Sequence, residues 1–241
     1  MDLSIVIPAY NEARKVARDI AAASEFLAGN NLSGEIIIAS DGSTDDTADV
    51  AEKTPAAGDI PVVVLRLAHG GKGSALRQGM VQSRGQYAMF ADSGVCVPFA
   101  DALRGLALLQ AGECDIANGS RRLPASVINR PQNFYRRTLS RAFRWTTLRY
   151  MGLPGHLTDT QCGFKLYKGE VARELYGQCK TDGFMFDMEI LMRAVIRNYR
   201  IREFPVDWTW DTDSRLKPMR ILWNTIHDLY VVKNRVRSEA R

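Results

Sequence analysis

The chain has 241 residues, of which 46% are hydrophobic, and a formal net charge of +5 at pH 7. This length and composition fit one ordinary globular domain with a sizeable core. No apolar run approaches the ~18 residues that predict a transmembrane helix, and the N-terminus lacks the basic and apolar regions of a signal peptide. Four scattered cysteines without a Cys-x-x-Cys pair argue against zinc and suit a reducing compartment. The positive charge permits an acidic partner such as a phosphate or a lipid surface.

Apolar runs alternate with helical patterns through the first half of the chain, which is typical of a parallel sheet. Here the pattern predicts strands over 3–8, 36–39, 60–67 and 87–91, and helices over 13–27, from 44 onward and over 75–83. In the second half we expect strands over 115–120 and 202–206 and helices over 187–198 and 219–237.

A turn of Ser40, Asp41, Gly42 and Ser43 follows the second predicted strand. Ligands of open α/β sheets bind at the carboxyl ends of the strands, so Asp41 is expected beside a ligand. A carboxylate only accepts hydrogen bonds, which suits an N–H of a base or the hydroxyls of a ribose. An Asp-Gly turn without any function is the alternative.

A glycine-rich stretch, His69 to Ser74, precedes the helix predicted over 75–83. Glycines before a helix N-terminus, with Lys72 among them, can form an anion site. The spacing differs from that of a Walker loop, and a plain flexible turn explains the stretch equally well.

Two of these segments together resemble the opening of the family 2 glycosyltransferases. They are Ser-Ile-Val-Ile-Pro-Ala-Tyr-Asn-Glu, ending at Glu12, and Ser-Asp-Gly-Ser-Thr-Asp-Asp-Thr, beginning at Ser40. The resemblance implies an α/β fold of the GT-A (Rossmann-like) type, with a mixed, mostly parallel sheet and helices on both faces. We expect a single GT-A domain over 1–241, with the nucleotide-sugar half at 1–120 and the acceptor half at 121–241.

The resemblance also assigns a donor site. In the family, the second acid of an Asp-Asp-Gly-Ser turn holds the base; here Ser40 replaces the first acid and Asp41 matches the second. The donor-binding residues implied are Pro8, Ala9, Tyr10, Glu12, Asp41, Lys72 and Asp92.

A divalent cation, Mg²⁺ or Mn²⁺, is implied at Asp92, because family members carry Asp-x-Asp there to reach the metal on the donor diphosphate. This chain keeps Asp92 but has Gly94 in the second place, and the Cys96 thiol is a poor ligand for a hard cation. We therefore expect metal dependence to be weak or atypical.

The second half carries a more specific resemblance. Asp159-Thr-Gln-Cys-Gly-Phe-Lys165 and Gly183-Phe-Met-Phe-Asp-Met-Glu189 are similar to segments of the dolichyl-phosphate β-glucosyltransferase branch. This implies inverting transfer of a hexose, glucose first, from UDP-glucose or a similar donor to a polyprenyl phosphate. Arginine forks match phosphate oxygens. The implied catalytic residues are Arg121, Asp159, Asp187 and Glu189, and those implied for the acceptor phosphate are Arg121, Arg136, Arg137 and Lys165.

Residues 129–151 interleave arginines with aromatic residues. Arg137, Arg141 and Arg144 fall on one helical face, as in basic amphipathic helices that lie on anionic membranes. We expect a cytoplasmic protein that is peripheral on the inner face of the membrane. A nucleic-acid surface and a solvated helix face are the alternatives, although the motifs elsewhere make nucleic acid an unexpected partner.

Two other functions stay open at this point, and so does the oligomeric state. One is a GT-A transferase that acts on a soluble hydroxyl acceptor, for which Asp187 or Glu189 would be the natural general base. The other is an inactive relative that only binds a nucleotide-sugar.

Overall fold

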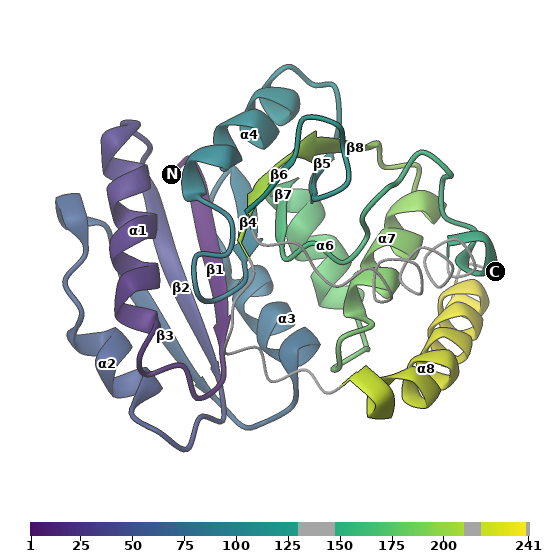
Figure 1. The fold of residues 1–241 in the computed structure, drawn as a ribbon, viewed down its shortest axis with the longest axis horizontal. Helices are drawn as coiled ribbons and strands as arrows, with labels where there is room; N and C mark the ends of the chain where they lie inside the picture. Colours follow the sequence, from purple (N-terminus) through teal and green to yellow (C-terminus); the bar gives the residue numbers. More distant parts are fainter. Residues whose placement is uncertain (130–147, 210–217, 240–241) are drawn as a thin grey trace.

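A computed structural model describes residues 1–129, 148–209 and 218–239, with the backbone alone for 218–226. Seven strands form its main sheet in the order β3-β2-β1-β4-β7-β5-β8 (Figure 1). All run parallel except β7, which pairs antiparallel with both β4 and β5. The bounds are β1 Leu3–Ala9, β2 Gly34–Asp41, β3 Val62–Leu67, β4 Tyr87–Ala91, β5 Ile116–Ser120, β7 Phe164–Lys168 and β8 Ile201–Pro205.

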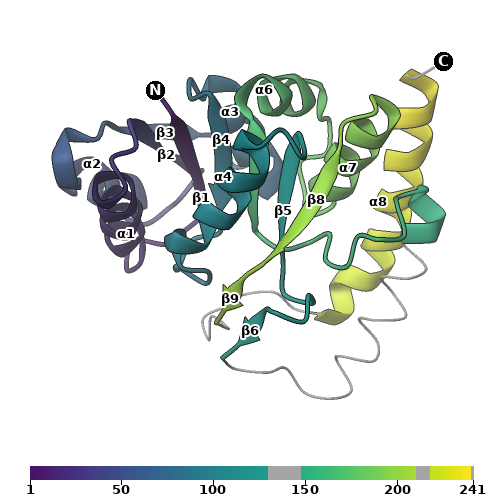
Figure 2. The same cartoon turned by 90° about the horizontal axis from the view of Figure 1, so that it is seen from above.

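Helices cover both faces of this sheet (Figures 1 and 2). One face carries α1 Val16–Gly29, α2 Thr47–Lys53 and α4 Ala102–Gln110, and the other carries α3 Lys72–Gln82, α6 Gly169–Gln178, α7 Phe186–Ile196 and α8 Pro218–Glu239. The central strands are apolar on both sides: Ile5 and Ile7 pack toward α1, while Val6 between them packs toward α3. The predicted mixed, mostly parallel sheet with helices on both faces is confirmed.

A second, two-stranded sheet lies beyond the carboxyl ends of β5 and β8 (Figure 2). Its strands are β6 Val127–Ile128 and β9 Asp207–Trp208, which run parallel. Because β9 follows β8 directly, this ribbon carries Trp208 to the edge of the main sheet where the parallel strands end. Two single 3₁₀ turns, η1 Ala57–Asp59 and η2 Phe99–Asp101, are also present.

β7, α4 and α6 were not predicted, and the starts of the first two predicted helices differ from the prediction. α1 begins at Val16 rather than at residue 13, because Asn11 adopts a left-handed conformation (φ 54°) and turns the chain first. The Asn11 side chain then accepts a hydrogen bond from the Thr44 amide (2.8 Å), and Ser43 Oγ accepts one from the Asn11 amide (3.1 Å). These contacts tie the β1 and β2 turns together and delay α2 until Thr47.

Within the described ranges, none of the helices is long and apolar enough to cross a membrane.

Candidate active site

The site forms where the parallel strands end, because β1, β2, β4 and β5 all deliver their carboxyl ends to one edge of the sheet. The antiparallel β7 brings its beginning to the same edge, since Ala91 pairs with Phe164. Asp92 therefore meets Gly163: the Asp92 amide donates to the Gly163 carbonyl (2.9 Å). A Cβ on Gly163 would lie 2.0 Å from Asp92 Oδ2, so this position accepts only glycine while Asp92 points into the site.

Asp92 belongs to a cluster of two lysines and two carboxylates. Lys72 Nζ lies 2.5 Å from Asp92 Oδ1, and Lys165 Nζ lies 2.7 Å from Asp187 Oδ1. The Phe90 ring faces both ammonium groups, and its centre lies 6.0 Å from Lys72 Nζ and 5.2 Å from Lys165 Nζ. The two pairs therefore form one cluster over the Phe90 ring, with the Lys165–Asp187 pair buried and the Lys72–Asp92 pair partly exposed.

The ionisation of this cluster follows from burial and alternating charge. Burial lowers the pKa of Lys72, but the Asp92 and Asp187 carboxylates outweigh it, so the pKa of Lys72 lies above its ordinary value. Burial also raises the pKa of Asp187, and the ammonium groups of Lys165 and Lys72 only partly offset that rise. Lys72 is thus held as a cation that carries its charge into the site.

A second ion pair lies at the end of β5. Arg121 donates to the Asp159 carboxylate through Nε (2.6 Å) and Nη2 (2.9 Å), and its guanidinium lies 5.4 Å from the centre of the Trp208 ring. Glu203 anchors Asp159 from behind by accepting from the Asp159 amide (2.8 Å). Burial raises the pKa of Asp159, but the adjacent Arg121 charge outweighs it, so the pKa lies below its ordinary value.

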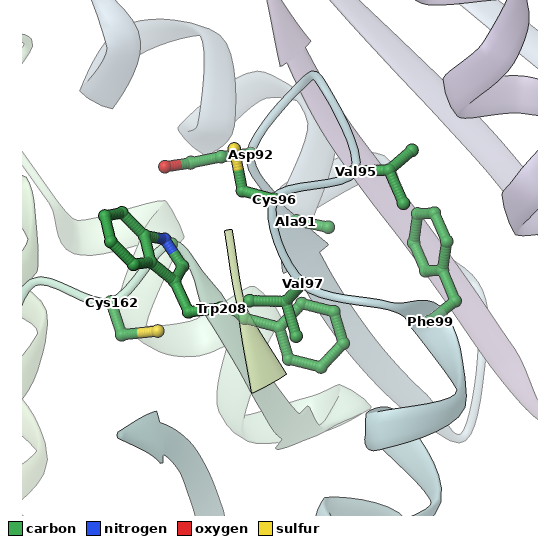
Figure 3. A pocket seen from close by; sticks show the side chains of 10 residues that line it. Ala91, Asp92, Val95, Cys96, Val97, Phe99, Cys162 and Trp208 are labelled. Carbon is green, nitrogen blue, oxygen red and sulfur yellow. The ribbon is translucent and has the colours of Figure 1, made fainter. Parts of the chain in front are cut away.

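A cavity of about 20 Å³ separates the Asp92 turn from Trp208 (Figure 3). The figure shows the Trp208 indole with Asp92 and Cys96 beyond one edge and Cys162 beyond the other. Val95, Val97, Phe99 and Phe164 make most of its remaining wall apolar. This volume holds about one water molecule and is too small for a sugar, so the substrates must lie outside it.

Asp41 ends β2 as predicted, but its carboxylate is already engaged. It accepts from the amides of Gly70 (2.8 Å) and Gly71 (2.9 Å), and only 6% of its side chain is exposed. His69 Nδ1 lies 3.0 Å from the second carboxylate oxygen, and the His69 ring stacks on Tyr10 with centroids 4.6 Å apart. Tyr10 and Asp41 are therefore brought together by His69, which contacts both of them.

The glycine-rich stretch is not an open anion cradle. Its first amides point at Asp41, and the amides of Gly73 and Ser74 donate to the Asp182 carbonyl at 2.7 and 3.2 Å. Glycines are needed because a Cβ on Gly73 would lie 2.3 Å from the Thr181 carbonyl oxygen. The stretch joins the two halves of the chain, and its Lys72 side chain is what reaches the site.

Two predicted roles do not fit the geometry. Lys165 has no exposed surface and donates to Asp187 and to the Cys162 carbonyl, so it supports the site from inside and does not present a charge to an acceptor phosphate. Glu189 is equally buried, and its carboxylate accepts from the Thr181 amide (2.9 Å) and from Arg193 Nε (2.9 Å). Glu189 therefore holds the 180–181 turn against α7, away from the cluster, and is not placed as a general base.

The other predicted residues fall into two groups. Pro8 and Ala9 end β1 beside the Asp41 turn, and Glu12 pairs with Lys15 while its amide donates to Thr47. Arg136, Arg137 and most of the 129–151 segment lie outside the described residues.

Sequence reasoning missed the residues that hold the Asp92 turn. Asp19 on α1 accepts from Ser93 Oγ (2.6 Å) and from the Gly94 amide (2.9 Å), and Arg18 donates to the Gly94 carbonyl (2.7 Å). The turn needs this support because Gly94 and the β-branched Val95 both have positive φ, 100° and 48°. The signal in the sequence was Asp19 itself, an acidic residue next to the apolar face of the helix predicted over 13–27.

Asp92 offers one ligand position for a divalent cation. Its Oδ1 is buried and paired with Lys72 Nζ at 2.5 Å, so a cation bound there would meet the Lys72 charge. Across the described ranges, no three His, Cys, Asp or Glu side chains gather in a way that could hold a metal ion. An ion at this site would use Asp92 and oxygens of the donor diphosphate, and would help to neutralise that diphosphate as it leaves.

This mixed sheet, with a charged site at its carboxyl edge, is a fold of the GT-A type. The chain superimposes on glucosyl-3-phosphoglycerate synthase from Mycobacterium tuberculosis in complex with Mn²⁺, UDP-glucose and phosphoglyceric acid, with a TM-score of 0.67, 17% identity, and coverage of 98% of this chain and 79% of that one. The same enzyme in complex with Mg²⁺ and UDP gives a TM-score of 0.63 at 19% identity, covering 96% of this chain and 77% of that one.

The family follows from the sequence match. The model of "Glycosyl transferase family 2" matches residues 4–176, and the chain belongs to this family. It is 32% identical to the dolichyl-phosphate beta-glucosyltransferase of Drosophila melanogaster over 96% of this chain and 74% of that protein. The Dictyostelium discoideum enzyme of the same name is 34% identical, over 90% of this chain and 69% of that protein. Glycosyltransferase AglD of Haloferax volcanii is 31% identical over 91% of this chain, which spans only 35% of AglD.

Proposed function

We propose that the protein transfers glucose from UDP-glucose to a dolichyl-type polyprenyl phosphate, with inversion at the anomeric carbon. The observation that carries the proposal is the placement of two cationic sites, Lys72 beside Asp92 and Arg121 beside Asp159, at one edge of a GT-A sheet. The dolichyl-phosphate beta-glucosyltransferases that resemble most of the chain support the acceptor and the sugar. Structural neighbours that bind UDP-glucose support the donor.

The chemistry asks little of a general base. A phosphate monoester has a second pKa of about 6, so the acceptor oxygen is already anionic at neutral pH. The site must instead bring two anions together, and fixed cations do this best in a desolvated cleft. Arg121 uses Nε and Nη2 for Asp159, which leaves its remaining nitrogen for the acceptor phosphate. Lys72 faces the donor diphosphate, where its charge stabilises the leaving group.

The direct test is transfer of glucose from UDP-glucose to dolichyl phosphate in detergent, beside soluble sugars as alternative acceptors. We expect product with the lipid phosphate only. Turnover should survive exhaustive chelation in part, because Lys72 already neutralises charge next to Asp92. If glucose is transferred only to soluble sugars, the acceptor is a soluble hydroxyl compound and not a lipid phosphate. A complete loss on chelation, restored by micromolar Mg²⁺, would mean that further ligands complete the metal site.

Asp41→Asn is expected to weaken UDP-glucose binding about tenfold, since a hydrogen bond to a charged group contributes roughly 1.5–3 kcal/mol. The substitution keeps the shape of the side chain but turns one acceptor oxygen into a donor, which then faces the N–H of the base. Isothermal calorimetry measures the change. Affinity equal to that of the wild type would remove Asp41 from the donor site.

We also propose that the protein works at the cytoplasmic face of a membrane, with residues 129–151 on anionic lipid. Each basic residue near such a surface contributes about 1 kcal/mol, so several give reversible, salt-sensitive binding. Replacing Arg137, Arg141 and Arg144 with Gln should release the protein from anionic vesicles and slow lipid glycosylation, with UDP-glucose affinity unchanged. Co-sedimentation at low and high salt measures this. Wild-type protein that ignores anionic vesicles at low salt would favour a soluble acceptor.

A further inference from the structure

His69 makes an unusual pair of contacts for a residue that is largely exposed. Its side chain is 59% exposed, yet its ring stacks on Tyr10 with an interplanar angle of 27° and a centroid distance of 4.6 Å. Its Nδ1 lies 3.0 Å from the Asp41 carboxylate and also 3.0 Å from the Asp41 carbonyl oxygen. The His69 ring is therefore held by the face of the Tyr10 ring and by two acceptors of Asp41, a carboxylate oxygen and the carbonyl oxygen.

The backbone is shaped to allow this approach. Gly42 has a φ of +63°, and a Cβ there would lie 2.5 Å from the His69 amide nitrogen. The glycine of the Asp-Gly turn thus lets the loop that carries His69 close onto β2. The two following amides, those of Gly70 and Gly71, fasten that loop to Asp41.

These contacts are the ones that a uracil ring would need at the same place. A planar heterocycle stacks on a tyrosine, and an N–H of the ring donates to a carboxylate that can only accept. Our proposed donor site assigns Asp41 to the base and includes Tyr10 beside it. A base stacked on Tyr10 and the His69 ring would then compete for the same aromatic face and the same carboxylate oxygen.

We propose that His69 occupies the base position of the donor site in the free protein, and that the nucleobase binds by displacing its ring. This inference rests on the proposed function, because it takes Asp41 and Tyr10 as the base site. The exposure of His69 makes the displacement feasible, since the ring loses few other contacts when it swings out. The apparent donor affinity is then reduced by the fraction of molecules in which the ring is in place.

His69→Ala is the test, with UDP, uridine and inorganic pyrophosphate as separate probes in calorimetry. Removing the competing ring should tighten UDP and uridine binding, by roughly three- to tenfold on the scale of one net hydrogen bond. Pyrophosphate has no base, so its affinity should stay the same. His69→Phe keeps a ring that can stack but has no donor for Asp41, and should give a smaller gain than His69→Ala.

The matched control is His156→Ala, which removes an exposed histidine away from the donor site and should leave all three affinities unchanged. Thermal melting confirms that each variant is folded. If His69→Ala binds uridine no more tightly than the wild type while Asp41→Asn still binds UDP more weakly, the proposal for His69 is wrong and the donor site stands. If Asp41→Asn binds UDP as tightly as the wild type, the donor site itself is wrong. A gain that extends to pyrophosphate would mean that His69 acts by charge or loop closure, and would also overturn the proposal.

Discussion

Arg121→Gln is expected to lower kcat/KM for polyprenyl phosphate by about 10²- to 10³-fold, the usual cost of removing one fixed donor that faces developing or opposing charge. The guanidinium is clamped by Asp159 through two nitrogens and backed by the Trp208 ring, so it meets the acceptor already oriented. Arg121→Lys keeps the charge but cannot make the forked contact, and should recover only part of the loss. Steady-state kinetics with varied lipid phosphate measures both variants.

Arg202→Gln is the control, because it removes an equal charge from a side chain that is 61% exposed and lies near the start of β8, away from the edge that carries the site. It should change the kinetics little. UDP-glucose affinity should also be similar in all three variants, since the proposed donor contacts lie at the ends of β1, β2 and β4 and at the start of α3. A loss in Arg121→Gln that appears equally in donor affinity would mean that Arg121 serves the diphosphate and not the acceptor.

The sequence predicted the half of the site that local patterns encode. β4 falls at 87–91 as expected, and Asp41 and Asp92 end their strands, because a buried strand followed by a polar turn leaves a strong local signal. The pairing of Arg121 with Asp159 depends on residues 38 positions apart in the chain, and periodicity carries no information on such contacts.

The other features of the site depend on the topology of the sheet, which local sequence patterns do not encode. β7 was not predicted as a strand: two of its five residues are lysines, whereas Phe164 to Tyr167 are all buried. The prediction placed Lys165 at the acceptor phosphate. Only the antiparallel insertion of β7 between β4 and β5 places this lysine over Phe90 and against Asp187. The burial of Lys165 and Glu189 is thus a tertiary effect that overrides their usual preference for solvent.

The buried pair also sets the largest stability effect that we expect. Lys165→Met should destabilise the protein by about 3–5 kcal/mol, because it leaves the Asp187 carboxylate buried without its nearest partner. Methionine fills a similar volume, so the loss reports the uncompensated charge and not a cavity. Urea denaturation monitored by circular dichroism measures the free energy of unfolding.

Lys168→Met, three residues along the same strand, is the matched control. Its ammonium also lies 2.7 Å from a carboxylate, that of Asp115, but its side chain is 31% exposed and Arg200 stays beside the acid. Solvent and the second cation should hold its cost to about 1 kcal/mol or less.

Lys165→Met combined with Asp187→Leu should regain much of the stability lost by the single variant, since an apolar pair replaces a buried ion pair at little cost. That double variant should nevertheless show reduced activity, because the Asp187 carboxylate, after that of Asp92, helps to keep Lys72 charged. Equal costs for Lys165→Met and Lys168→Met would show that burial is not what makes the Lys165–Asp187 pair critical.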